Sequence, residues 1–355
     1  MRKNILLIVV LLALGAPVGS EDLDNPFLSP ERRQEIIRSQ EDKWDMDAAP
    51  SPSWPSGNGT AHLLKPRSLS LTSGQYGAFD LGPLRLIVPA GAFGNQPVKI
   101  RVLVLTSTRD FILAGIPLDF REGGKPGVLI SDGMFHLEFL DARGQSVRPL
   151  RPLSVEMQPS QSEDMGMYRR DGTSWTRVGS AGIEQRWPED CNVYRRQNDG
   201  RPRLILVEDS PCGESVAMRF YQGIDEPAWW NFDKPAPNIT CIKGELSIPG
   251  NGLQIRLEAA GLDYLGLSSA TVQPDGRFAM NVAADKKVKV YALLTDKSSR
   301  RIYLGSLPTL HTSSKTAFYN ESESECQNVG LLEVHKGQIR HLTDADFFLK
   351  SIGLP

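Results

Sequence analysis

From Leu69 onward, apolar and polar residues alternate with a period of two, which is typical of β-strands. The stretch VKIRVLVLT, residues 98–106, places valine or isoleucine at every second position, so one face of the predicted strand is fully apolar. Turn signals such as Asp171-Gly172 separate other short runs of this kind. The pattern predicts an all-β chain with two or three β-sandwich domains, an N-terminal arm and a short C-terminal helix.

The stretch RLIVPAGAF, residues 85–93, begins as a strand and then breaks at Pro89. A glycine-rich phosphate loop leads from its glycines into the N-terminus of a helix. Here the chain continues instead into the strand at 98–106. We therefore predict a corner of the β-fold, in which Pro89 ends the first strand, Gly91 permits the bend and Phe93 turns inward.

Both ends of the chain depart from this β pattern. Residues 1–20 begin with Arg2 and Lys3 and continue with an apolar run that ends in small residues, which predicts a secretory signal peptide. An uncleaved membrane anchor is the alternative. No later apolar run is long enough for a transmembrane helix, so we expect no transmembrane span after signal cleavage. Thr343 as N-cap and Gly353 as stop signal predict a short helix near the C-terminus.

These patterns divide the chain into six segments. They are a signal peptide at 1–20, an N-terminal arm and linker at 21–65, a first β-sandwich at 66–160, a β-rich connecting region with a disulfide hairpin at 161–237, a second β-sandwich at 238–334, and a C-terminal tail helix at 335–355. The sequence leaves open whether the connecting region completes the first sandwich or forms a domain of its own.

Four cysteines in an exported chain predict two disulfides, for which three pairings exist. Cys191 and Cys212 lie on either side of Asp199-Gly200, a strong hairpin-turn signal, so they are placed to link the two arms of one hairpin. Cys241 and Cys326 would then form the second pair. A zinc site is the competing interpretation, but no Cys-x-x-Cys motif or nearby histidine pair supports it.

The charged and catalytic residue types form no recognisable site. The formal net charge is −2, which removes the electrostatic argument for nucleic acid as a partner. The five histidines are dispersed and no His-Glu-x-x-His motif occurs. His136 lies between Phe135 and Leu137 in an alternating run, so we expect its side chain to point outward. We predict no catalytic residues, no cofactor and no metal.

One aromatic cluster is a candidate binding surface. Trp229, Trp230 and Phe232 occur together in the proline-flanked stretch EPAWWNFDKP. Exposed aromatic rings stack on sugars or anchor a protein partner. The alternative, which the position of the cluster before the last predicted domain favours, is that the rings fill an interface between two domains.

Two stretches resemble known families. Residues 68–180, with Pro89-Ala-Gly-Ala-Phe93 between two strands, resemble the ZU-type β-domain of ankyrins, netrin receptors and cartilage intermediate layer protein. Residues 240–334 resemble the carboxypeptidase-regulatory, or transthyretin-like, β-sandwich. The matching motifs are Cys241-Ile-Lys-Gly244, Pro274-Asp-Gly-Arg-Phe278 and Cys326-Gln-Asn-Val-Gly330. This second resemblance implies a disulfide between Cys241 and Cys326 that joins the first and last strands.

Neither of these families is catalytic in itself, and both contain domains that mediate binding. By analogy with them, we expect a non-enzymatic, exported binding, scaffold or adhesion protein of the cell envelope that assembles with other exported proteins. A carbohydrate-binding protein that uses exposed aromatics is the first alternative. An accessory or regulatory subunit of an exported hydrolase is the second.

Overall fold

The computed structural model describes residues 60–159, 165–186, 194–196, 202–204, 216–296, 301–319 and 325–354. The predicted signal peptide, the N-terminal arm up to residue 59, and both Cys191 and Cys212 lie outside these residues. Residues 50–355 group into one compact unit, to which all of the described residues belong.

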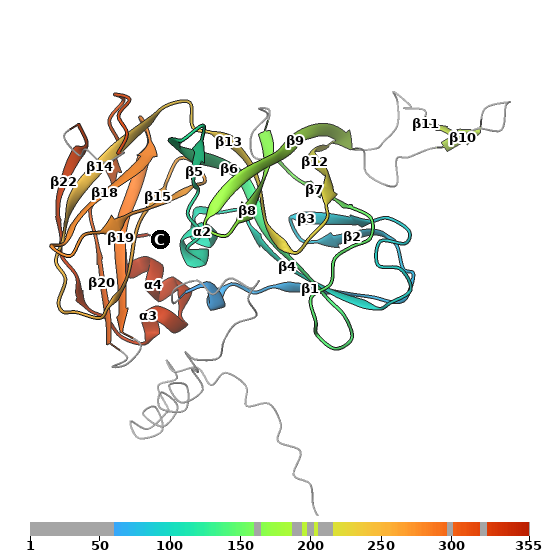
Figure 1. Ribbon diagram of the computed structural model, residues 1–355, viewed down its shortest axis with the longest axis horizontal. Helices are drawn as coiled ribbons and strands as arrows, with labels where there is room; N and C mark the ends of the chain where they lie inside the picture. The colour runs from blue at the N-terminus through green and yellow to red at the C-terminus, as the bar shows by residue number, and fades with distance from the viewer. Residues whose placement is uncertain are drawn as a thin grey trace, which may run out of the picture. The chain divides into compact units, whose positions relative to one another are not determined.

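The described residues are dominated by antiparallel strands, which confirms the all-β prediction (Figure 1). The largest sheet has 11 strands and runs in the order β1-β4-β6-β13-β8-β9-β12-β7-β3-β2, with β5 paired to β6. Its strands are β1 (Arg67–Leu71), β2 (Gly77–Leu81), β3 (Leu84–Val88), β4 (Val98–Leu105), β5 (Asp119–Glu122), β6 (Lys125–Leu140), β7 (Leu153–Met157), β8 (Met165–Asp171), β9 (Ser174–Arg186), β12 (Val216–Ile224) and β13 (Ala228–Pro235). Strands from the predicted connecting region therefore lie in the same sheet as the strands that precede it.

Between β9 and β12 in the sequence, two short strands form a separate two-stranded sheet. Its strands, β10 (Tyr194–Arg196) and β11 (Pro202–Leu204), pair in antiparallel register, and the predicted Asp199-Gly200 turn lies outside the described residues. The pairing of these arms agrees with the hairpin predicted for this stretch. The disulfide predicted to link them lies outside the described residues.

The break at 85–93 is a corner, as predicted. Strand β3 ends at Val88, and Gly91 adopts a φ of 76°, a left-handed conformation that favours glycine. Phe93 is buried, and its ring centroid lies 5.4 Å from that of Phe139. The corner thus packs into the apolar core that the large sheet forms. That core also contains Leu86, Ile100, Leu137, Val155 and Trp230.

The C-terminal part of the chain is a second β-region made of two sheets. One sheet has the order β17-β18-β14-β22 and the other β16-β15-β19-β20-β23, with β21 paired to β19. The strands are β14 (Ile239–Leu246), β15 (Gln254–Gly261), β16 (Leu267–Ser269), β17 (Thr271–Val272), β18 (Arg277–Ala283), β19 (Lys287–Asp296), β20 (Arg301–Ser306), β21 (Leu310–His311), β22 (Gln327–Leu332) and β23 (His335–Lys336). Their buried apolar side chains form one cluster, which includes Ile242, Leu257, Phe278, Val290 and Leu294. The Pro274-Asp-Gly part of the second matching motif forms the turn between β17 and β18.

The described helices are short. They are η1 (Ala61–Leu63), α2 (Thr108–Ala114), α3 (Arg340–Thr343) and α4 (Ala345–Ser351). The predicted C-terminal helix is present, but its N-cap is Asp344, whose carboxylate accepts a hydrogen bond from the Phe347 amide at 3.0 Å. The prediction of Thr343 as N-cap was wrong, because Thr343 is the last residue of α3. Phe348 and Ile352 are buried.

A buried polar network joins the second β-region to the segments that precede it. Arg256 of β15 lies 2.7 Å from Glu258 and donates a 2.7 Å hydrogen bond to Thr60 and a 2.9 Å hydrogen bond to Tyr291. It also donates to the carbonyl of Ile112 in α2. Burial is the largest single effect and lowers the pKa of Arg256, but the charge of Glu258 and the contacts with Glu258 and Tyr291 together outweigh it, so the net shift is upward. Arg256 therefore remains charged and fastens α2 to the β15 strand.

Candidate functional site

The aromatic cluster proposed as a binding surface is buried. Trp229, Trp230 and Phe232 belong to β13, which pairs with β6 on one side and β8 on the other, and they are 7%, 1% and 0% exposed. Trp230 and Phe232 lie in the core of the large sheet. Trp229 lies in a separate apolar cluster together with Phe111 of α2 and Tyr168 of β8. None of the three rings is presented to a sugar or to a partner protein.

His136 is also buried, so the prediction that it points outward was wrong. It is 1% exposed, and its ring centroid lies 5.0 Å from that of Trp229, its cross-strand neighbour. The physical reason is that α2 and the start of β5 cover the second face of this part of the sheet, where the cluster around Phe111 and Phe120 forms. Strand β6 is consequently buried on both faces.

Beside this apolar cluster lies a group of buried polar residues on β6 and β13. Ser131 donates a 2.6 Å hydrogen bond to the side-chain oxygen of Asn231 and accepts a 2.9 Å hydrogen bond from the Gly133 amide. Asp233, the cross-strand neighbour of Ser131, is 0% exposed. Burial raises the pKa of Asp233 well above its ordinary value, and the charge of the neighbouring Asp132 adds to the shift. The uncharged carboxyl is therefore favoured at this position.

A fully buried ion pair lies near the same end of β6. Arg219 of β12 contacts the carboxylate of Asp132 at 2.6 Å, and both side chains are 1% exposed. The net contribution of such a pair to stability is small, because desolvation offsets most of the attraction, but removing one partner leaves an uncompensated charge. The ion pair therefore links β6 to β12, and loss of either side chain is expected to destabilise the fold.

A pocket of about 340 Å³ opens next to these buried groups. It is lined by Met165, Gly166, Tyr168, Arg177, Ser180, Ala181, Lys234 and Pro235. Asp233 immediately precedes Lys234 and lies opposite Gly166 in the pairing of β13 with β8. Gly166 allows the side chains of Tyr168 and Arg177 to pack closely against the backbone of β8, since a Cβ there would lie 2.9 Å from the Tyr168 ring and 3.0 Å from Nε of Arg177. Arg177 donates a 3.3 Å hydrogen bond to Ser180.

A second feature of interest is the edge formed by β22. This strand pairs in parallel with β14 and ends the order of its sheet, so among the described residues no strand pairs with its other side. Leu331 on β22 is 50% exposed. The predicted disulfide between Cys241 and Cys326 is present, with the two Cα atoms 4.7 Å apart, and it fixes the start of β22 to β14. The edge is therefore covalently held in place.

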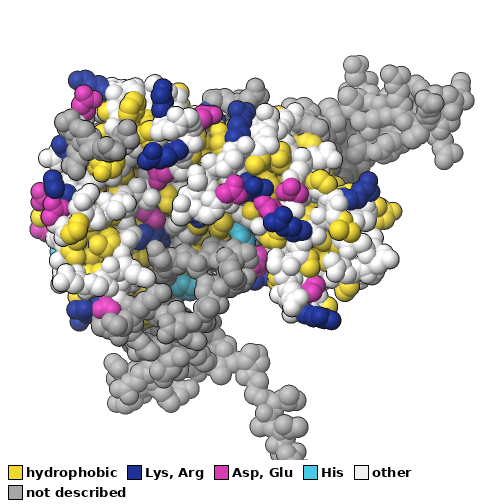
Figure 2. Space-filling model, viewed as in Figure 1, with side chains coloured by type: hydrophobic (Ala, Val, Ile, Leu, Met, Phe, Trp, Pro, Cys, Tyr) yellow, Lys and Arg dark blue, Asp and Glu magenta, His cyan; other side chains and the backbone are white. Residues whose placement is uncertain are grey.

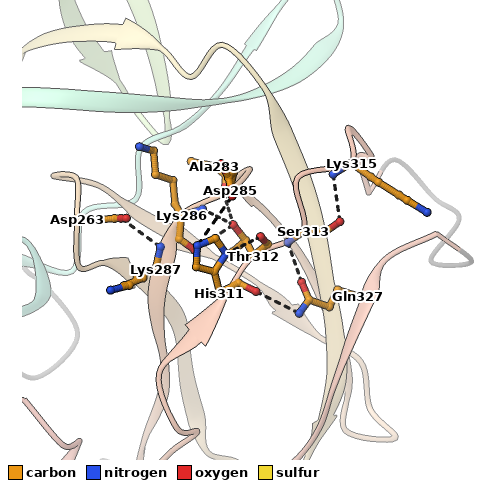
Figure 3. Close-up of polar contacts among 10 residues, drawn as sticks. All are labelled: Asp263, Ala283, Asp285, Lys286, Lys287, His311, Thr312, Ser313, Lys315 and Gln327. Carbon is orange, nitrogen blue, oxygen red and sulfur yellow. Dashed lines mark hydrogen bonds and ion pairs between the residues drawn. The ribbon is translucent and has the colours of Figure 1, made fainter.

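Hydrogen bonds add a second attachment at the start of β22 (Figure 3). The side chain of Gln327 accepts a 2.9 Å hydrogen bond from the Ser313 amide and donates a 3.3 Å hydrogen bond to the His311 carbonyl. Thr312, between these two residues, accepts from the Lys286 amide at 2.9 Å and donates to the Ala283 carbonyl at 2.8 Å. The 311–313 segment thus ties β22 to the turn between β18 and β19.

Other surface features are less distinctive than the pocket and the β22 edge. On the face drawn in Figure 2, basic and acidic side chains are interspersed rather than gathered by sign. In the described ranges no three His, Cys, Asp or Glu side chains cluster as metal ligands. None of the helices seen in those ranges is both long enough and apolar enough to span a bilayer.

Sequence reasoning missed the pocket and the polar residues behind it. Asn231 and Asp233 belong to a proline-flanked stretch whose sequence favours a domain junction. In the structure this stretch is β13, a central strand of the large sheet. The only available signal was the alternation of Trp230 and Phe232 with polar neighbours. Comparisons with known proteins add no assignment: no protein-family model matches the chain, and no curated protein matches it.

Proposed function

We propose that this chain is an exported, non-enzymatic binding protein of the cell envelope that assembles with another exported protein through the outer edge of β22. The observation that carries the proposal is this edge, which has a free side among the described residues and an exposed leucine, Leu331. An extended segment of a partner adds to such an edge by main-chain hydrogen bonds, while side chains next to the edge supply specificity.

The attachments of β22 support this role. The Cys241–Cys326 disulfide and the two hydrogen bonds of Gln327 hold the start of the strand in its extended conformation. A strand that is already ordered loses little conformational entropy when a partner adds to it, and this improves affinity. Gly330, with a φ of 81°, introduces a shift in the pairing with β14. Such a shift restricts indiscriminate edge pairing.

Two further observations support export. The first 20 residues have the pattern of a secretory signal peptide. Disulfides such as Cys241–Cys326 persist in oxidising compartments outside the cytoplasm. The resemblance to ZU-type and transthyretin-like domains agrees with a binding role, by analogy alone. The sugar-stacking alternative loses its basis, because Trp229 and Trp230 are buried.

The proposal is tested by recovering the tagged full chain from the native envelope fraction and measuring its assembly state by native size-exclusion chromatography. Leu331→Lys places a charge beside the edge, and lysine at an edge opposes strand addition. The matched control is Val178→Lys, which introduces the same charge at a 37% exposed apolar position of β9. We expect a stoichiometric complex that Leu331→Lys disrupts and Val178→Lys retains. Recovery of a lone monomer, or equal behaviour of the two variants, contradicts the proposal.

A further inference from the structure

One end of the large sheet presents two strongly exposed apolar side chains. Leu150 is 76% exposed and Tyr76 is 65% exposed, the highest values among the large apolar residues that the structure describes. Tyr76 lies in the loop between β1 and β2, and Leu150 lies in the loop between β6 and β7. The strand register brings both loops to the same end as the β3–β4 loop, because β1 and β6 end opposite the start of β4 and β2 begins opposite the end of β3.

Hydrogen bonds connect these three loops. The Ser73 hydroxyl in the β1–β2 loop donates a 2.6 Å hydrogen bond to the Asn95 carbonyl in the β3–β4 loop. The Leu150 amide donates a 2.6 Å hydrogen bond to the Ala92 carbonyl of the same loop. Single exposed apolar residues are common on proteins, but here Tyr76 and Leu150 stand on loops that are tied to one another.

Two of the three loops carry no charge. Residues 72–76, TSGQY, and residues 89–97, PAGAFGNQP, contain no Asp, Glu, Lys or Arg. Placing these loops at the headgroup boundary of a lipid bilayer therefore removes no charged side chain from water. Tyrosine suits such a boundary, since its ring is apolar while its hydroxyl remains hydrated.

Exposed cations stand beside the uncharged loops. They are Lys99 at the start of β4 and Arg143 and Arg151 in the β6–β7 loop, and none of them forms an ion pair with a residue that the structure describes. Arg151 donates a 2.9 Å hydrogen bond to the β3–β4 loop, at the carbonyl of Ala90. Asp141 is the only carboxylate of the β6–β7 loop. Three cations thus stand against one carboxylate on this side of the sheet end.

The remaining described carboxylates at this end are engaged with arginines on the side of β8 and β12. Glu226 contacts both Arg148 and Arg169, and Asp171 contacts Arg169 at 3.1 Å. Asp225 lies within electrostatic range of Arg169. Strands β7 and β9, after which the described part of this sheet is interrupted, both finish at the opposite end, since β7 ends opposite the start of β3 and β9 opposite the start of β12. The cationic side therefore lies next to the exposed apolar side chains.

We propose that this end of the large sheet docks onto an anionic lipid surface. Tyr76 and Leu150 enter the headgroup boundary, while Lys99, Arg143 and Arg151 contact lipid phosphates. A lipid boundary accommodates separate loop tips, whereas the anchors of a protein interface fill well-packed pockets on the partner. The docking loops share no strand with the β22 edge, so this proposal stands or falls independently of the assembly function.

Vesicle sedimentation of the chain recovered from the envelope fraction tests the proposal. One set of vesicles contains phosphatidylcholine alone, and the other contains phosphatidylcholine and phosphatidylglycerol in equal parts. We expect the anionic vesicles to bind the chain at least about tenfold more tightly at low ionic strength, and we expect added salt to reduce this preference. Equal binding to both vesicles overturns the proposal. Binding to neither also overturns it and makes a protein partner the better explanation of the exposed loops.

A first pair of variants tests the apolar contacts. In Tyr76→Ser/Leu150→Ser we expect a loss of affinity for the anionic vesicles of about tenfold or more, because two apolar side chains no longer leave water. The matched control is Val178→Ser/Phe318→Ser, which changes two exposed apolar residues outside these loops and should bind as the wild type does. An equal loss in both double variants, or no loss in either, contradicts docking through this end.

A second pair of variants tests the charge. Arg143→Gln/Arg151→Gln removes two cations, and we expect a loss of about tenfold or more for the anionic vesicles, with binding to phosphatidylcholine unchanged. The matched control is Arg121→Gln/Lys125→Gln, which removes two exposed cations from the β5–β6 hairpin and should retain the wild-type affinity. Equal effects of the two double variants would show that total charge, rather than this surface, determines lipid binding, and would overturn the proposal.

Discussion

The Cys241–Cys326 disulfide should provide a large share of the stability of the second β-region. The perturbation is the double substitution of both cysteines by alanine. The two residues are 85 apart in sequence, so the bond closes a loop that spans nearly the whole region from β14 to β22. For a loop of about 85 residues, the chain-entropy model gives a loss of roughly 15 cal/mol/K, or about 4.6 kcal/mol at 25 °C.

Packing makes a smaller additional contribution. Both cysteines are buried in a small cluster with Ala317, against which Tyr319 packs. The double variant therefore also loses the contacts of two buried sulfur atoms. The single variant Cys326→Ala loses the same cross-link but keeps the Cys241 sulfur. Comparison of the single and double variants consequently separates the cross-link from the packing.

Urea unfolding followed by far-UV circular dichroism is the appropriate assay. The described tryptophans, Trp175, Trp229 and Trp230, all lie in the large sheet, so their fluorescence does not report on the second β-region. We expect both the single and the double variant to lose several kcal/mol in the free energy of unfolding. A loss of less than about 1 kcal/mol in both would refute the reasoning that the cross-link acts by restricting the unfolded chain.

Three further changes test other parts of the structure. Arg256→Met leaves the buried Glu258 without its cation, and we expect a loss of about 3 to 5 kcal/mol by chemical denaturation; a loss below 1 kcal/mol contradicts the role of the network. Burial raises the pKa of Asp119 to about 7, so its contribution to stability is present at low pH and is lost as the pH rises through about 7. In Asp119→Asn the free energy of unfolding should therefore fall less between about pH 4 and 7 than in the wild type, by at most about 4 kcal/mol. An unchanged pH dependence of the free energy of unfolding refutes this. Gly91→Ala should cost about 1 to 2 kcal/mol in thermal unfolding, because alanine is strained at a φ of 76°; no loss argues against the strained corner.

The strands and turns were predictable because their signals are local. The alternation in residues 98–106 is strand β4, and the break at 85–93 is the corner with Gly91 in a left-handed conformation. The Cys241–Cys326 pairing was predicted on two grounds: the Asp199-Gly200 turn favoured a Cys191–Cys212 pair and left these two as the second pair, and the transthyretin-like resemblance implied the same bond. Helix α2 was missed although its signals were present, a capping box from Ser107 and Asp110 and a glycine stop at Gly115.

The candidate sites were less predictable, because burial depends on distant parts of the chain. Alternation placed His136 on the face opposite Phe135, but it gave no sign that α2 and β5 cover that face. Likewise, the sequence predicted that Trp229 and Trp230 are either exposed or at a domain interface. They are buried instead, in strand β13, which lies between β6 and β8 in the sheet. The pocket depends on the pairing of β8 with both β9 and β13, which brings Arg177 and Lys234 together across 57 positions of sequence.

Site-specific photocrosslinking in the native envelope tests most directly whether β22 is the assembly surface. A photoreactive amino acid replaces Leu331 in the full chain, and the same amino acid replaces Val178 as the control at a comparable exposed apolar position. We predict one discrete crosslinked adduct from position 331, which mass spectrometry maps to an extended segment of a single exported protein. Absence of an adduct at 331, or identical adducts from both positions, would contradict the proposed edge-strand assembly.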